Sequence, residues 1–245
     1  LIMALPKLNV PVYETILPST EQVVKYRPFL VREEKILLTA MESEDETVMT
    51  DSIKQILGNC IQGNLNINEL PTFDIEYLFL RLRAKSIGEK ITLGLKPFPC
   101  GQNEGNLCKF STEVEINLEE VRVVKNKNHT SKIMIDDKIG IKFRYPELLT
   151  NKKSNTKEQS DVNLGLEIIK KCVDMIFTPE ETHEKGSFTE KDLDDFIDSL
   201  NSAQFQKINE FFNTIPKLSH TVEYTCKTCG EEKKTTIEGL NSFFG

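Results

Sequence analysis

The sequence has no tryptophan, only three histidines and no long run of apolar residues. A helix that crosses a membrane needs about 18 or more consecutive apolar residues, and no window of this chain approaches that length. The N-terminal residues also lack the apolar core of a signal peptide. We therefore expect neither a membrane span nor an export signal.

Residue patterns that form active sites are also missing. His129, His183 and His220 lie outside any metalloprotease motif, and none accompanies a nucleophile in a recognisable motif. There is neither a phosphate-binding glycine loop nor a dinucleotide fingerprint. The acidic side chains between Asp192 and Asp198 are typical of a solvated helix face. These absences predict a protein that is not an enzyme.

Positive charge is in the minority, with 31 Lys and Arg against 38 Asp and Glu, a net charge of −7 and a pI near 5.2. Proteins that bind nucleic acid usually carry a basic face. Here the basic runs at Lys125–Lys127 and Lys152–Lys153 are short and lie in polar loops. The charge balance therefore disfavours nucleic acid and favours protein partners.

The period of the apolar residues changes along the chain. Helical spacing predicts a helix over 30–43, with Val31, Ile36, Leu37 and Met41 on one side, and another over 47–61. A third begins near Pro71 and is apolar on more than one face. Between 90 and 145 the apolar residues alternate, which predicts four or five antiparallel strands, with the loop 126–130 forming one hairpin.

The C-terminal half returns to helical spacing. We predict helices over 162–177 and 202–214, and a third that begins at the variant capping box of Thr189 and Asp192. The N-terminal arm carries three prolines in its first eighteen residues, which disfavour a helix. We predict two strands there, on either side of Pro18. Such an arm is suited to pairing with another sheet or another chain.

The predicted fold class is α+β: an antiparallel β region with cysteine knuckles, flanked by N-terminal and C-terminal helical segments. The chain length allows one large domain or two small ones. The expected organisation is an extended arm at 1–30, a helical region at 31–88, the β region with the first cysteine pair at 89–145, a polar linker at 146–161, a second helical region at 162–216, and a C-terminal knuckle at 217–245 that rejoins the β region.

The C-terminal segment from Val222 to Phe244 predicts a strand, a tight turn and a second strand, with Cys226 and Cys229 at the turn and Gly230 directly after them. Thiolates in C-x-x-C spacing supply half of a tetrahedral zinc site. A redox role is disfavoured, because the pair opens no helix and is followed by two glutamates.

A second cysteine pair, Cys100 and Cys108, brackets a glycine-containing turn between predicted strands. We expect one structural zinc ion held by Cys226, Cys229 and some or all of Cys100 and Cys108. His220 is a weaker candidate ligand, and free thiols in a plain β-turn are the alternative. Cys60 and Cys172 fall on the apolar stripes of predicted helices, so we expect each to be a small buried side chain.

Four sequence segments resemble those of a known family: MALPKLNVPVYETILPST, VKYRPFLVREEKILLTAMES, LPTFDIEYLFLRLRAKSIGE and CKTCGEEKKTTIEGLNSFF. In this order they resemble the baseplate hub subunit or hub assembly proteins of T-even-type, contractile-tailed bacteriophages. The resemblance covers nearly the whole chain. The wide spacing of Cys100 and Cys108 departs from the C-x-x-C expected there.

The resemblance implies a non-enzymatic role in virion tail assembly in the host cytoplasm, with other baseplate hub and tail proteins as partners. It leaves open whether the protein acts transiently or remains in the tail baseplate of the virion. The terminal Phe243 and Phe244 are candidate anchors for a partner, or they fold back on the core. A zinc-ribbon adaptor that binds nucleic acid is the alternative function.

Overall fold

The computed structural model describes residues 8–43, 45–95, 112–148, 161–227 and 229–243. These residues form helices and antiparallel strands in several sheets, which confirms the predicted α+β class. Two compact units are present: unit 1 contains residues 1–124 and 217–245, and unit 2 contains residues 125–216. Unit 2 is thus inserted between two segments of unit 1. None of the described helices is both long and apolar enough to cross a membrane.

Unit 1 begins with the predicted pair of strands. Strand β1 (Tyr13–Ile16) pairs antiparallel with β2 (Val23–Tyr26), and β3 (Ile61–Gln62) adds to β2. The connecting turn is anchored by Asp74, whose carboxylate accepts hydrogen bonds from the backbone nitrogen of Ser19, at 3.1 Å, and from its hydroxyl group. This stretch of the arm is therefore part of the packed body of unit 1.

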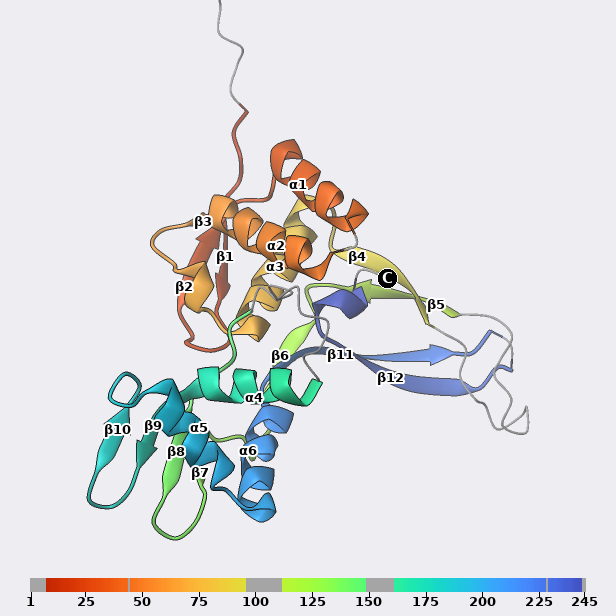
Figure 1. Ribbon diagram of the computed structural model, residues 1–245. Coiled ribbons are helices and arrows are strands. Elements are labelled where there is room, and N and C mark those ends of the chain that lie inside the picture. Colours follow the sequence, from red (N-terminus) through yellow and green to blue (C-terminus); the bar gives the residue numbers. More distant parts are fainter. Residues whose placement is uncertain (1–7, 44, 96–111, 149–160, 228, 244–245) are drawn as a thin grey trace, which may run out of the picture. The chain divides into compact units, whose positions relative to one another are not determined.

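Three α-helices follow the hairpin in unit 1 (Figure 1). They are α1 (Val31–Glu42), α2 (Glu46–Cys60) and α3 (Thr72–Ser86), with the short 3-10 helix η1 (Ile67–Glu69) before α3. As predicted, α3 is buried on several faces, and Phe79 and Leu80 are completely enclosed. Helix α1 corrects one expectation. Ile36 and Leu37 face the core, whereas Val31 and Met41 are exposed.

Two long hairpins complete unit 1. Strand β4 (Lys90–Leu95) pairs with β5 (Thr112–Asn117), and β11 (Lys217–Thr225) pairs with β12 (Glu232–Glu238). Strand β6 (Arg122–Val124) lies against β11, so the C-terminal hairpin adds to a strand from the region 89–145. Arg81 of α3 secures the β5–β6 connection, donating to the carbonyls of Leu118 and Val121 at 3.0 and 2.5 Å.

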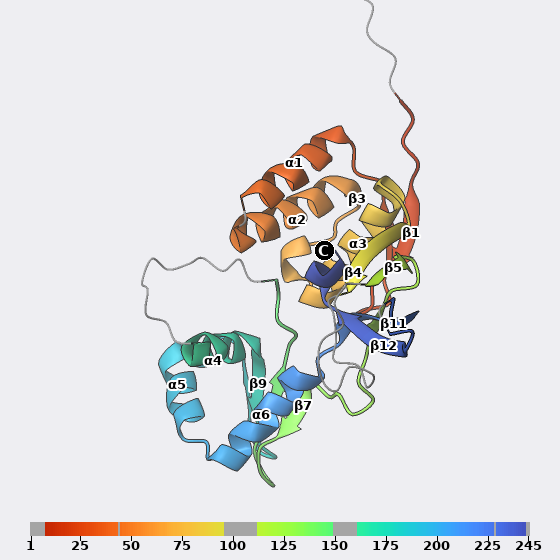
Figure 2. The same ribbon diagram turned by 90° about the vertical axis from the view of Figure 1, so that its right-hand side faces the viewer.

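Unit 2 contains a four-stranded sheet in the order β10-β9-β8-β7, with three helices on one face (Figure 2). Its core joins Ile141 and Phe143 of the sheet to Ile208 and Phe211 of the last helix. The elements are β7 (Lys132–Met134), β8 (Gly140–Phe143), α4 (Asp161–Cys172), β9 (Val173–Phe177), β10 (Thr182–Glu184), α5 (Glu190–Asp198) and α6 (Ser202–Thr214).

Two predictions in this part of the chain are wrong. The helix expected over 162–177 ends at Cys172, and Val173–Phe177 forms strand β9 between β8 and β10. A short apolar run is compatible with either a helix or a strand. Here the run forms a strand, because β8 and β10 pair with it on its two sides. The loop 126–130 joins no hairpin, because β6 pairs with β11 and β7 pairs with β8. The capping box of Thr189 and Asp192 is confirmed at the start of α5.

Candidate functional site

The turn between β11 and β12 holds the C-x-x-C pair. The backbone nitrogen of Cys226 donates to the carbonyl of Glu231 at 2.9 Å, and that of Gly230 donates to the carbonyl of Cys226 at 2.8 Å. Gly230 has φ +74°, a left-handed conformation that glycine adopts without steric cost. The strand, turn and strand predicted for this segment are therefore present, with both cysteines inside the closed turn.

The two thiols lie together on the inner side of this turn. Cys226 is only 7% exposed, and the partly buried Cys229 packs against it in a small apolar cluster. Neighbouring thiolates in a C-x-x-C turn are typical of half a tetrahedral zinc site. The spacing of these two residues is that of half such a site, and the remaining two positions would need other ligands.

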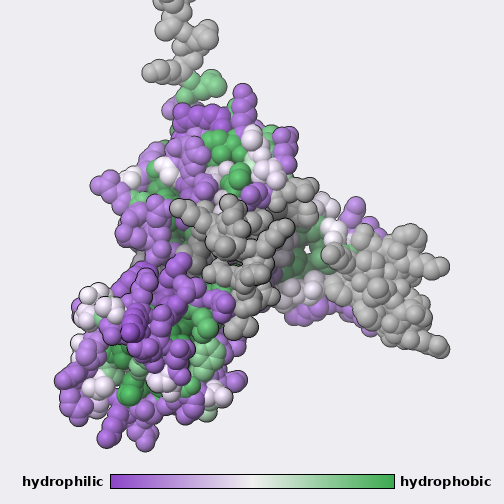
Figure 3. Space-filling view, in the orientation of Figure 1, coloured by the Kyte–Doolittle hydropathy of each residue, from purple (hydrophilic) through white to green (hydrophobic). Residues whose placement is uncertain are grey.

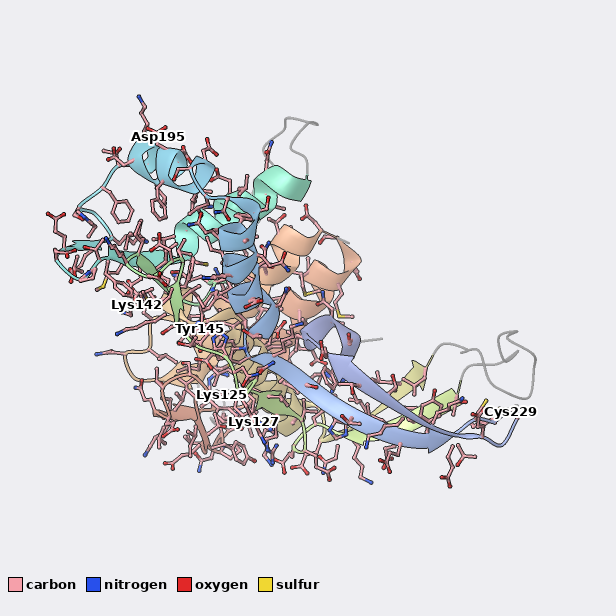
Figure 4. The ribbon with its side chains drawn as sticks, turned by 90° about the horizontal axis from the view of Figure 1, so that it is seen from below. Lys125, Lys127, Lys142, Tyr145, Asp195 and Cys229 are labelled. Carbon is pink, nitrogen blue, oxygen red and sulfur yellow. The ribbon has the colours of Figure 1, made fainter. Side chains whose placement is uncertain are left out.

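The first residues of β5 lie next to the turn. The backbone nitrogen of Lys227 donates to the hydroxyl of Thr112 at 3.4 Å, and its ammonium lies 3.9 Å from the carboxylate of Glu113. Thr112 pairs with Leu95 in the last register position of the β4–β5 hairpin. Figure 4 shows Cys229 at the tip of the β11–β12 hairpin, on the side where β4 ends and β5 begins.

Cys100 and Cys108 lie outside the described residues, in the segment between Leu95 and Thr112. Within the described part of the chain, no group of three or more His, Cys, Asp and Glu residues is arranged to hold a metal ion. His220 does not join the thiols, because it lies six residues before Cys226 along β11. At about 3.3 Å per residue this separation is roughly 20 Å.

The other two cysteines are packing residues. Cys60 ends α2, and Cys172 ends α4; both are buried. Burial raises the pKa of each thiol to about 11, so both are protonated at neutral pH. They behave as the small buried side chains predicted from the helix stripes.

Phe243 and Phe244 are the candidate partner anchors at the C-terminal end of the sequence. Phe243 closes the 3-10 helix η3 (Leu240–Phe243) and is 1% exposed, so it anchors the C-terminal segment in the core of unit 1. Of the two alternatives for this residue, the structure shows Phe243 folded back on the core, where η3 contacts α3. Phe244 lies outside the described residues.

Exposed apolar side chains instead occur on the α1–α2 pair. Val31 and Leu38 of α1 are 65% and 52% exposed, and Met41 and Val48 are also exposed. Figure 3 shows apolar residues among hydrophilic ones over this part of unit 1. The spacing of seven residues places Val31 and Leu38 on one side of α1, away from buried Leu37. Sequence reasoning missed this surface because it placed Val31 and Met41 on the same side of the helix as Ile36 and Leu37.

Comparisons with known proteins place the chain in a family. Residues 10–245 match the family described as T4 bacteriophage base plate protein, which is essentially the whole chain. No curated protein and no solved structure matches it. The family match spans the N-terminal hairpin, both units and the cysteine turn. The chain therefore belongs to the T4 bacteriophage base plate protein family.

Proposed function

We propose that this protein is a baseplate hub subunit or hub assembly factor, which acts through protein contacts and not by turnover during virion tail assembly in the host cytoplasm. The observation that carries this proposal is the family match over residues 10–245. Its partners are other baseplate hub and tail proteins. The net charge of −7 supports contacts with proteins more than with nucleic acid.

The exposed apolar side chains of α1 support a contact surface on unit 1. Single exposed apolar residues are common, but a group on one helix face marks an interaction site more often. Val31 and Leu38 form such a group, with Met41 and Val48 nearby in the α1–α2 hairpin. We assign this α1–α2 surface (Val31, Leu38 and Met41 of α1 and Val48 of α2) to a baseplate partner.

The test is affinity capture from a lysate of phage-infected cells. Tagged wild-type protein should retain baseplate hub or tail proteins, and Val31→Glu with Leu38→Glu should release them. The matched control is Leu164→Glu, which changes an exposed leucine of unit 2. Circular dichroism establishes that each variant is folded. Capture of no tail protein by folded wild-type protein would remove the support for this function, and salt-sensitive retention of nucleic acid would favour a zinc-ribbon adaptor.

We also propose that Cys226 and Cys229 hold one structural zinc ion together with Cys100 and Cys108. The contact between Lys227 and Thr112 supports this proposal, because it brings the start of β5 to the cysteine turn. Cys108 is four residues before Thr112, and Cys100 is five residues after Leu95. An extended chain spans about 3.3–3.6 Å per residue, so both cysteines are within reach of the turn.

A zinc ion with four thiolate ligands is closed to substrate and serves as a cross-link. Here it would join the β4–β5 hairpin to the β11–β12 hairpin within unit 1. Elemental analysis of the purified protein should find one zinc per chain. Cys226→Ser and Cys100→Ser should each reduce the zinc content, whereas Thr225→Ser, an exposed neighbour on β11, should leave it unchanged. Zinc-free wild-type protein, purified without chelator, would overturn the site.

A further inference from the structure

The insertion of unit 2 has a specific geometry at its two ends. The chain leaves unit 1 after Val124 and returns at Lys217, and these two residues are register partners in the β6–β11 ladder. The segment that enters unit 2 and the helix that ends it therefore connect to neighbouring positions of unit 1. Within unit 2, His129 of the entering segment is hydrogen-bonded to Thr214, the last residue of α6.

The hydrogen bonds of Thr214 define which ring nitrogen of His129 carries the proton. The Thr214 hydroxyl donates to the backbone carbonyl of Glu210 at 2.7 Å, with the carbonyl of Phe211 at 3.1 Å. Its oxygen is then the acceptor for His129 Nδ1, at 2.9 Å. This arrangement puts a proton on Nδ1, and the charge of the ring then depends on whether the surroundings of Nε2 accept a second proton.

The other ring nitrogen has no partner. Nε2 of His129 is buried and makes no hydrogen bond within the part of the chain that the structure describes. The ring stacks on Tyr145 at 5.5 Å between centroids and lies 5.1 Å from the ring of Phe211. Figure 4 shows Tyr145 on the segment that follows β8. A second proton on this imidazole would enter an aromatic environment that offers no acceptor.

The charged side chains around His129 do not compensate for this. Lys125 and Lys127 of its own segment are exposed, and Arg144, next to Tyr145, is paired with Glu147 at 3.0 Å. On α6, Glu210 is exposed, and the ammonium of Lys207 bonds the carbonyls of Met134 and Ile135. Burial lowers the pKa of His129, and no carboxylate opposes this effect.

We propose that the contact of His129 with Thr214 is a pH-sensitive clasp at the ends of the inserted unit. With neutral His129 the clasp holds the entering segment against the end of α6. When Nε2 takes a proton from solvent, the ring leaves its aromatic site and the two segments separate. This regulation goes beyond the proposed structural role, because it makes the order of unit 2 depend on pH while the strands of unit 1 stay paired.

The direction of the pH effect follows from proton linkage. In the unfolded chain His129 titrates near its ordinary value of about 6.5, and in the folded chain it titrates lower. The unfolded state therefore binds more protons in mild acid. The stability contributed by His129 is complete above pH about 6.5 and is lost as the pH falls below it. One proton changes the opening equilibrium by at most about tenfold per pH unit.

Amide hydrogen exchange of the full-length protein tests the clasp. Rates at pH 7.5 and 5.5 are corrected for the intrinsic pH dependence of exchange. Peptides covering 125–130 and 208–216 should lose protection several-fold at pH 5.5, and peptides of β11 and β12 should not. His129→Phe keeps an aromatic ring but cannot take a proton, so it should abolish this pH dependence. His183→Phe, which changes an exposed histidine on β10, is the control.

Nitrogen NMR of the wild-type protein gives a second measurement that needs no variant at the clasp. The His129 resonances should show the proton on Nδ1 at neutral pH and a titration midpoint below about 6.5. His183→Gln and His220→Gln spectra assign the signals. The proposal is overturned if His129 carries its proton on Nε2, if its midpoint is 6.5 or higher, or if His129→Phe retains the pH-dependent loss of protection.

Discussion

Arg27 and Glu33 form an ion pair that joins the end of the N-terminal hairpin to the first turn of α1. The guanidinium Nη2 lies 3.0 Å from the Glu33 carboxylate, which is completely buried. The same carboxylate accepts from the backbone nitrogen of Leu30 at 2.9 Å, and Arg27 also donates to the carbonyl of Asn59 at 2.9 Å. The Arg27–Glu33 pair therefore holds the residue after β2, the start of α1 and the end of α2 in one arrangement.

Removing the charge of Glu33 should destabilise the protein. We expect Glu33→Gln to lower the free energy of unfolding by about 3 kcal/mol, because it leaves the partly buried Arg27 without its counter-ion. Urea unfolding monitored by circular dichroism measures the loss. Glu34→Gln, an exposed neighbour in the same turn, should change stability by less than about 0.5 kcal/mol. Equal effects of the two substitutions would contradict this role for Glu33.

The lowered pKa of the Glu33 carboxyl predicts that the protein loses stability in acid. Burial raises the pKa of Glu33, but hydrogen bonds from Arg27, the backbone of Leu30 and Arg32 outweigh it and lower the pKa to about 2. A lowered carboxylate pKa stabilises the fold above the unfolded value of about 4.5, and this contribution is lost as the pH falls toward 2. Unfolding experiments between pH 5 and 2 should show a steeper loss for wild type than for Glu33→Gln.

Asp74 should anchor the first hairpin to α3. We expect Asp74→Ala to cost about 1–3 kcal/mol, because the backbone nitrogen and hydroxyl of Ser19 lose their acceptor. Hydrogen exchange of residues 17–22 should increase together with this loss. Glu69→Ala, at an exposed position of η1, is the matched control. If Asp74→Ala is as stable as this control, the carboxylate does not hold the turn.

Gly140 should be needed for the packing of unit 2. A Cβ at this position would lie 2.3–2.9 Å from ring carbons of Phe177 on the neighbouring strand β9. Gly140→Ala should displace that ring and lower the free energy of unfolding by about 1–2 kcal/mol. Gly165→Ala in α4, where no atom lies within 4 Å, should be neutral or stabilising by up to about 1 kcal/mol. The combination of Gly140→Ala with Phe177→Leu should recover part of the loss.

Removal of metal should loosen unit 1 at the cysteine turn. If Cys226 and Cys229 bind zinc, treatment with a chelator should lower the unfolding temperature and increase hydrogen exchange at 222–235, since metal binding that requires the fold also stabilises it. Cys226→Ser should be insensitive to the chelator. A wild-type protein that responds no more than Cys226→Ser would show that no metal supports the turn.

Local pattern was sufficient for several elements. The apolar stripe through Ile53, Ile56 and Leu57 predicted α2 within one residue at each end, and the alternation through Ile91 and Leu93 predicted β4. The C-x-x-C spacing followed by Gly230 predicted the closed turn. In each case the residues that decide the structure are within one or two turns, or within a few strand positions, of each other.

Other features depended on partners far away in the chain. Val173–Phe177 is a strand because β8 and β10 lie on either side of it, and its own residues also fit a helix. Val31 was expected on the same side of α1 as Leu37, but Glu33 and Leu37 are buried and Val31 is exposed. Asp74 is an ordinary acidic residue in the sequence, and only the fold brings it to Ser19, 55 residues earlier.

The amino-acid sequence by itself determined the α+β class, most helices and strands, and the cysteine turn, because periodicity, capping and turn residues act over short distances. The tertiary structure alone decided that residues 125–216 form an inserted unit, that Phe243 is enclosed, and that His129 meets Thr214 85 residues later. Such contacts depend on which surfaces meet once the chain has folded, and no local pattern encodes that choice.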